Sequence, residues 1–152
     1  MYVRSANKCN LYTLIYYEIL RGSFWSVDLL CLECEQMILR HVHVDDKFET
    51  AQGLSFAIKA VEKGKMFLET SIGGSKWFHT KHAAACLHWM RIRGNAIEGV
   101  GSTNKNSVRM LVGRNGILAQ CQKCEWNVAY IWGILRGLPQ VHRGEGNKLF
   151  IP

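Results

Sequence analysis

The order of apolar and polar residues along the chain predicts a mixture of helices and strands. Leu54, Ile58 and Val61 recur at helical spacing within residues 50–63, which predicts an amphipathic helix that Gly64 ends. Polar capping residues at the start and glycines at the end predict further helices over three stretches, residues 11–21, 80–94 and 128–136.

The helix over residues 80–94 is expected to divide into an apolar face and a basic face. Thr80 is its expected cap, and Gly94 its expected end. The face that carries Cys86 and Met90 is expected to join the core. The other face is expected to form a solvated basic rim of Lys81, His88, Arg91 and Arg93.

Strands are expected where apolar residues run together or alternate with polar ones. Gly73-Gly74 can adopt the positive φ of a tight hairpin, which predicts paired strands over residues 65–72 and 76–79. Asn115-Gly116 predicts a second hairpin, formed by residues 107–112 and 117–120. Further strands are expected over residues 27–30, 36–44 and 148–151.

This irregular alternation of helices and hairpins predicts an α+β fold with antiparallel pairing and three to four helices. With 152 residues, of which 48% are hydrophobic, the chain can bury the core of one compact domain spanning residues 1–152. The two Cys-x2-Cys pairs are the one internal repeat in the sequence.

Those pairs, Cys31 with Cys34 and Cys121 with Cys124, are the strongest candidates for metal binding. Two intervening residues let both sulfurs face one ion at about 2.3 Å, so two such pairs provide the ligands of a structural Zn²⁺ site. Apolar residues on both sides of each pair predict strand-borne, zinc-ribbon-like knuckles. Because residues 35–120 separate the pairs, where a zinc ribbon has about 15–20 residues, a shared site would tie the two ends of the fold together.

A second arrangement uses the middle of the chain. His79, His82 and Cys86 fall at i, i+3 and i+7 and would share one helical face. One Cys-x2-Cys pair with His82 and Cys86 would also complete four ligands and leave the other pair free or in a second site. The remaining alternative is that the cysteines are reduced, buried and only fill space in the core.

His41-Val42-His43 is the second feature that suggests chemistry, because two imidazoles at i and i+2 of a strand point the same way. The triplet resembles the His-hydrophobic-His motif of the HUH nucleases, the Rep and relaxase group. The resemblance implies a divalent metal at His41 and His43 and a catalytic tyrosine on a later helix, for which Tyr130 is the candidate. Many Rep proteins carry a lysine one turn after that tyrosine, where this chain has Gly133 and Ile134.

The net charge of +7 comes from the second half of the chain. Residues 1–69 carry 8 Lys and Arg against 9 Asp and Glu, whereas residues 70–152 carry 11 against 3. Basic residues interleaved with aromatic ones suggest a nucleic-acid partner, since cations neutralise phosphates and aromatic rings stack on unpaired bases. The predicted hairpin would form a basic ribbon above the second knuckle, and the candidate contact residues are Arg91, Arg93, Lys105, Arg109, Arg114 and Lys123.

We therefore expect a zinc-stabilised, basic nucleic-acid-binding protein, DNA or RNA, without catalytic activity. The alternatives are an HUH-like metal-dependent nuclease and a protein-interaction or inhibitor module that acts on a nucleoprotein complex. No small-molecule cofactor is indicated. The chain has no run of about 20 apolar residues and its start lacks the apolar region of a signal peptide, so an intracellular, non-membrane location is expected.

Overall fold

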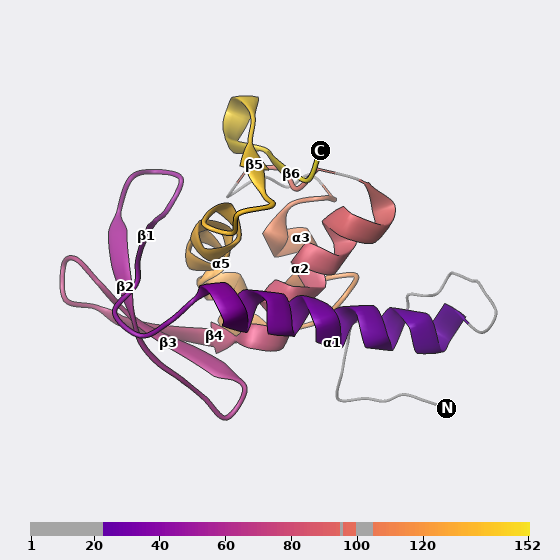
Figure 1. Cartoon of the computed structure of the whole chain (residues 1–152). Coiled ribbons are helices and arrows are strands. Elements are labelled where there is room, and N and C mark those ends of the chain that lie inside the picture. The colour runs from indigo at the N-terminus through magenta and orange to yellow at the C-terminus, as the bar shows by residue number, and fades with distance from the viewer. Residues whose placement is uncertain (1–22, 95, 100–104) are drawn as a thin grey trace.

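The computed structural model describes residues 23–94, 96–99 and 105–152, with side chains from Leu32 onward. These residues form a mixed α+β domain in which an antiparallel sheet lies on one side of a group of helices (Figure 1). The expected α+β class with antiparallel strands is confirmed, but the described residues contain five α-helices where three to four were expected. The helix expected over residues 11–21 lies outside the described residues.

The sheet is a four-stranded antiparallel meander in the order β1-β2-β3-β4. Its strands are β1 Lys47–Glu49, β2 Ser55–Glu62, β3 Lys65–Thr70 and β4 Ser75–His79. The hairpin between β3 and β4 confirms the prediction from Gly73-Gly74, and Gly73 has a φ of +93°. One face of the sheet is buried and consists of Phe56, Ile58, Met66, Leu68 and Phe78.

The helix expected over residues 50–63 is wrong, because most of that stretch is the central strand β2. Phe56 and Ile58 are buried and alternate with more accessible neighbours, the period of a strand that packs on one side. The turn before β2 uses Gly53 at a φ of +90°, with its N–H donating to the Thr50 carbonyl at 3.0 Å. Pairing with both β1 and β3 outweighs the helical spacing of the apolar residues.

The strands expected over residues 27–30 and 36–44 are also wrong, because α1 runs from Ser23 to His41. Cys34 and Ile38 lie one turn apart and are fully buried, and Val42 follows after another turn. This stripe packs on α2, which α1 crosses in Figure 1. The first Cys-x2-Cys pair is therefore part of a helix and is not a strand-borne knuckle.

Helix α2, Thr80–Arg93, follows directly after β4 and lies in the centre of the domain. It ends as predicted at Gly94, which is left-handed and donates its N–H to the Met90 carbonyl. The predicted cap is wrong: His79 occupies the N-cap position, and no side chain caps the helix. His88 is wrong as a rim residue because only 7% of it is exposed.

The hairpin expected around Asn115-Gly116 does not form. Residues Val108–Val112 are the short helix α3, whose first turn is capped by Ser107 Oγ, which accepts from the Met110 N–H at 3.2 Å. The short helix α4, Gln122–Trp126, follows. The predicted helix over residues 128–136 is confirmed as α5, Val128–Arg136.

The chain ends with β5 His142–Arg143, a 3-10 turn over Glu145–Asn147, and β6 Leu149–Phe150. The strand expected near residues 148–151 is confirmed as β6, which pairs with β5 in a separate two-stranded sheet. Trp132 of α5 is fully buried and donates its indole N–H to the Asn147 carbonyl at 2.9 Å, which fixes this end to the core.

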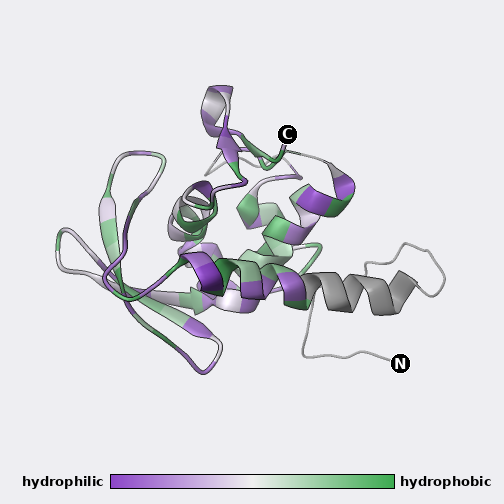
Figure 2. Cartoon of the chain, viewed as in Figure 1, coloured by the Kyte–Doolittle hydropathy of each residue, from purple (hydrophilic) through white to green (hydrophobic). Residues whose placement is uncertain are grey.

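Hydrophobic residues from both the sheet and the helices form one core cluster. The coloured part of α1 carries bands of both hydrophobic and hydrophilic residues, as an amphipathic helix at the edge of a core does (Figure 2). Among the described residues, no helix combines the length and the apolar character that crossing a membrane requires.

Candidate metal centre

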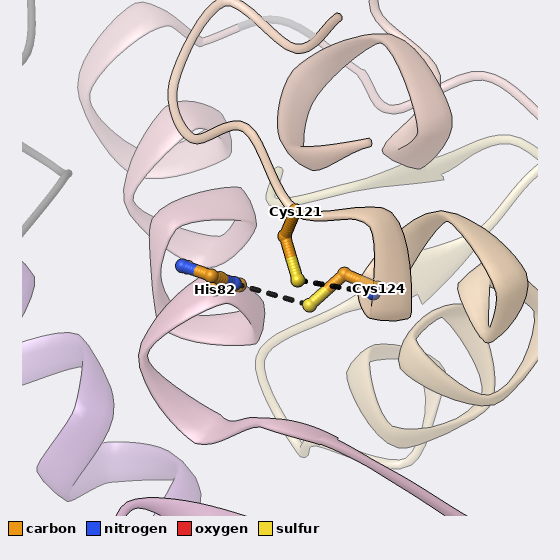
Figure 3. Close-up of side chains that lie close together, drawn as sticks. All are labelled: His82, Cys121 and Cys124. Atoms are coloured by element: carbon orange, nitrogen blue, oxygen red, sulfur yellow. Dashed lines mark hydrogen bonds between the residues drawn. The ribbon is translucent and has the colours of Figure 1, made fainter. Parts of the chain in front are cut away.

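Three potential metal ligands converge between α2 and α4 (Figure 3). One ligand atom each from His82, Cys121 and Cys124 lies within 4.8 Å of the other two. We call these residues the His-Cys-Cys group. Both cysteines are buried and His82 is half-buried, so the group lies just below the surface.

The local structure explains how each side chain reaches the site. His82 is in the first turn of α2, which starts where β4 ends. Cys121 is the N-cap of α4, and its sulfur accepts from the Cys124 backbone N–H at 3.1 Å. Because Cys124 follows in the first turn of α4, both sulfurs point toward His82, whose Nδ1 is 3.0 Å from Cys124 Sγ.

The two thiols shift each other's pKa in opposite directions. A hydrogen bond with Cys124 lowers the pKa of the Cys121 thiol. The same hydrogen bond, together with burial, raises the pKa of the Cys124 thiol. The site therefore favours one thiolate at Cys121, and a divalent cation would displace the remaining proton and hold both sulfurs as thiolates.

Two further residues, His79 and Cys86, lie beside the His-Cys-Cys group, although neither has a ligand atom within 4.8 Å of all three of its members. The His79 ring packs edge-on against the His82 ring with centroids 5.0 Å apart. Burial, and next the charge of His82, lower the pKa of His79, while the charge of Cys121 acts in the opposite direction. Cys86 lies one turn beyond His82, but it is fully buried, and that burial raises its pKa.

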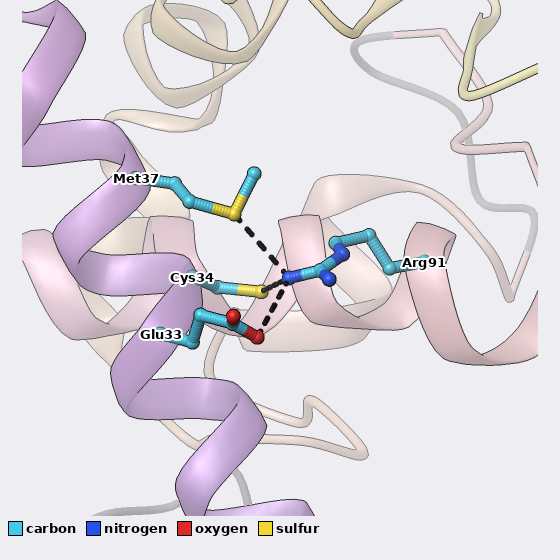
Figure 4. A network of polar contacts seen from close by, with 4 residues as sticks. All are labelled: Glu33, Cys34, Met37 and Arg91. Carbon is cyan, nitrogen blue, oxygen red and sulfur yellow. Dashed lines mark hydrogen bonds and ion pairs between the residues drawn. The ribbon is translucent and has the colours of Figure 1, made fainter.

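Cys34 contacts Arg91 and does not belong to the His-Cys-Cys group. Its sulfur lies 3.5 Å from an Arg91 guanidinium nitrogen, which also reaches Glu33 at 3.3 Å and Met37 Sδ at 3.3 Å (Figure 4). This network joins α1 to α2. The described residues thus bring Cys121 and Cys124 together with His82 and not with Cys34, and the Cys31 side chain lies outside the described set.

The strand that the HUH resemblance requires is absent at His41 and His43. His41 is the last residue of α1, and exposed His43 lies beyond it with its Nδ1 3.6 Å from Asp46 Oδ2. The i and i+2 geometry of a strand therefore does not apply to this pair. Tyr130 packs edge-on against Phe56, with ring centroids 5.2 Å apart.

The candidate nucleic-acid contacts are spread over several elements, because the predicted basic ribbon does not form. Arg109 and Arg114 both lie beside Glu125, with nitrogen–oxygen distances of 3.5 and 3.7 Å. Arg91 pairs with Glu33, as described above. The other three are Arg93 over the Trp89 ring, Lys105 exposed in the turn before α3, and Lys123 on α4 beside two tryptophans.

Comparison with known proteins assigns no relative. No protein family, no curated protein and no solved structure matches the chain. What the chain does must therefore be argued from its own residues.

Every member of the His-Cys-Cys group could be named from the sequence, but not which Cys-x2-Cys pair comes together with His82. The tryptophans and Lys123 of the outer face of the sheet were expected among the basic and aromatic residues of the second half, whereas Lys65 and Phe67 were not. Phe67 and Trp77 alternate with buried residues in their strands, and this alternation is the signal that could have identified that face.

Proposed function

We propose that the chain is a zinc-stabilised nucleic-acid-binding protein without catalytic activity. The observation that supports it most directly is the convergence of His82, Cys121 and Cys124 between α2 and α4. Two thiolates and one imidazole suit zinc better than magnesium or calcium, which prefer oxygen ligands. A metal at this point would link two helices that lie far apart in the sequence.

We propose His79 as the fourth ligand. The His79 ring packs edge-on against the His82 ring. His79 also interacts electrostatically with Cys121, and its backbone forms a hydrogen bond with the Cys124 sulfur. Cys86 is the weaker candidate because its thiol is fully buried and burial disfavours its ionised form. Two cysteines and two histidines would give a closed, four-coordinate structural site.

A hydrolytic role is less well supported. Zinc-dependent nucleobase deaminases also bind their metal with one histidine and two cysteines, and they use a glutamate two residues after the histidine for proton transfer. In this chain that position is Ala84. Among the described residues, no carboxylate belongs to the His-Cys-Cys group, so the site lacks the general base that such chemistry needs.

Nucleic-acid binding is supported by the charge of the chain. The net charge is +7, and the described lysines and arginines of the second half are distributed over β4, all the helices from α2 to α5, β5 and the connecting segments. A protein with this excess of positive charge favours binding to a polyanion, and its lysines and arginines release counterions from the phosphates that they contact. The affinity is therefore expected to fall steeply as the salt concentration rises.

The metal is tested by measuring zinc per chain in the wild type, in Cys121→Ser/Cys124→Ser and in Cys34→Ser. We expect one zinc in the wild type and in Cys34→Ser, and none in the double variant. Cobalt substitution should give thiolate-to-metal charge-transfer absorption, and His79→Ala should weaken metal binding more than Cys86→Ala. Equal zinc in all variants would refute the site.

Binding is tested separately, by fluorescence anisotropy with labelled single- and double-stranded DNA and RNA over a salt series. A linear fall of log affinity with log salt supports the proposal. The absence of binding to every polymer at low salt would overturn the nucleic-acid part of it and leave the metal site standing.

A further inference from the structure

The sheet has an aromatic and basic outer face that the core does not use. Phe67 and Trp77 are register partners on β3 and β4, and their strand neighbours Met66, Leu68 and Phe78 are buried on the inner face. Because side chains alternate along a strand, the rings of Phe67 and Trp77 must lie on the opposite side. Their centroids are 6.4 Å apart.

Lysines from two elements border this aromatic pair. Lys65 Nζ lies 4.2 Å from the Trp77 ring centroid, and Lys123 Nζ of α4 lies 5.2 Å from it. Lys123 is also 5.2 Å from the ring of Trp126, which is 60% exposed. We call Lys65, Phe67, Trp77, Lys123 and Trp126 the aromatic–lysine face.

The charge of this face is more available than that of the arginines elsewhere. Arg91, Arg109 and Arg114 each lie beside a carboxylate, as their ion pairs show. Lys65 and Lys123 lie over indole rings, and in the part of the chain that the structure describes neither forms an ion pair with a carboxylate. Nearby, Lys59 pairs with Glu69 at 3.6 Å.

The surface beside the rings also has room for a flat group. A hollow of about 340 Å³ is lined by residues of β2, β3 and β4, namely Lys59, Phe67, Leu68, Glu69, Ser75, Lys76 and Trp77.

We propose that single-stranded nucleic acid binds to the aromatic–lysine face, with bases stacked on Phe67, Trp77 and Trp126 and phosphates contacted by Lys65 and Lys123. A single strand is the better match because its unpaired bases expose their faces, whereas a duplex hides them in its own stack. Lysines beside the rings can contact the phosphates of a strand whose bases stack on those rings. This inference rests on the proposed nucleic-acid-binding function and names its surface and its substrate class.

The face adjoins the candidate metal centre. The His79 ring packs edge-on against Trp77 with centroids 5.2 Å apart and against His82 at 5.0 Å. Asn127, which follows α4, donates its side-chain N–H to the Trp77 carbonyl at 2.7 Å. A metal that fixes α4 to α2 would therefore also fix Lys123 and Trp126 relative to Trp77.

The experiment uses the full zinc-loaded chain and fluorescence anisotropy with a labelled oligothymidylate of about 12 nucleotides and a duplex of equal length. We expect the single strand to bind at least about tenfold more tightly than the duplex at the same salt concentration. Trp126→Ala should weaken single-strand binding about tenfold, and Phe67→Ala by a similar factor. Lys123→Glu should weaken it and reduce the salt dependence by about one counterion.

Two variants serve as matched controls. Ile72→Ala removes an apolar side chain that is 83% exposed at the tip of the β3–β4 hairpin, and Lys148→Glu reverses an exposed charge just before β6. Both should bind as the wild type does. Because Trp126 is exposed, Trp126→Ala keeps the test valid even if Phe67→Ala fails to fold.

The outcomes separate this inference from the function on which it rests. Single-strand binding that all three face variants leave unchanged, or equal affinity for the duplex, would overturn the face and leave nucleic-acid binding intact. No binding to either probe would overturn both. A concentration-dependent dimer that Trp126→Ala abolishes, without nucleic-acid binding, would assign the face to a second copy of the chain and would also overturn the proposal.

Discussion

Nδ1 of His82 lies 3.0 Å from Sγ of Cys124, although 42 positions separate the two residues in the sequence. The contact joins the first turn of α2 to the first turn of α4. Cys121 lies in the same group, so three potential metal ligands are brought together by the packing of two helices against each other. Metal binding and helix packing should consequently stabilise one another.

A strong chelator should lower the melting temperature of the zinc-loaded wild type. A ligand that binds only the folded state contributes stability that grows with its concentration above its dissociation constant, about 3 kcal/mol at a hundredfold excess. Differential scanning fluorimetry with and without chelator measures the effect. The variant Cys121→Ser/Cys124→Ser should already melt at the lower temperature, and an equal chelator effect in that variant would contradict the prediction.

Acid should destabilise the protein through His88. Burial lowers the pKa of His88 to about 4, and the charge of Arg91 adds to the effect. Between pH 6.5 and about 4, His88 binds a proton in the unfolded state but not in the folded state. The contribution of neutral His88 to the free energy of unfolding is therefore complete above pH 6.5, and it is lost as the pH falls through this window. The full loss is about 3 kcal/mol.

Urea unfolding at about pH 7 and about pH 5, in the presence of chelator, tests this prediction. The chelator removes the separate pH dependence of metal binding. His88→Leu should lose less stability on acidification than the wild type. A pH dependence that the substitution leaves unchanged would assign the acid sensitivity to other groups.

Helix α1 can be tested with a pair of truncations. A strand over residues 36–44 would place Ile38 and Val44 on the same face, whereas in the structure Ile38 is fully buried and Val44 is 52% exposed. Ile38→Ala should therefore cost about 2–4 kcal/mol of unfolding free energy, and Val44→Ala less than about 0.5 kcal/mol. Similar losses from chemical denaturation of both variants would favour the strand.

Helix α5 approaches the sheet closely at Gly133. A Cβ at this position would lie 2.7 Å from the Glu49 carbonyl oxygen and 2.9 Å from a Phe56 ring carbon. We expect Gly133→Ala to destabilise the fold by about 1–3 kcal/mol, and Gly133→Val to cost more. If both variants were as stable as the wild type in urea unfolding, α5 could move away from the sheet without penalty.

Local signals were sufficient to predict part of the fold. Gly73 after β3 and Gly94 after α2 have positive φ and set the boundaries of a hairpin and a helix through backbone geometry that acts within a few residues. Helix α5 also ends before Gly137 as predicted, although Gly137 itself has right-handed helical dihedrals. These elements lie where the sequence placed them. The same local information misassigned α1 and β2, since apolar residues in both stretches fit either period and only packing against neighbours decides between them.

The sequence predicted that cysteines and a histidine would form the candidate site, but not which cysteine pair would lie beside His82. A Cys-x2-Cys pair within a helix can look the same in sequence as one in a knuckle, so Cys34 and Cys124 were equivalent until α1 and α4 were placed. Selecting Cys121 and Cys124 requires knowing that α4 packs near the start of α2. The aromatic–lysine face likewise depends on the register between β3 and β4, which aligns Phe67 with Trp77.

A metal ion held by His82, Cys121 and Cys124 would also be an internal cross-link. A bond that closes a loop of about 40 residues restricts the unfolded chain and, by the loop-entropy argument used for disulfides, stabilises the fold by about 4 kcal/mol. During synthesis that loop cannot close until Cys124 has left the ribosome, so the helix that carries His82 emerges long before its metal partners. In the finished, metal-bound protein, a single protease cut between α2 and Cys121 would leave two fragments that coordination bonds still hold together.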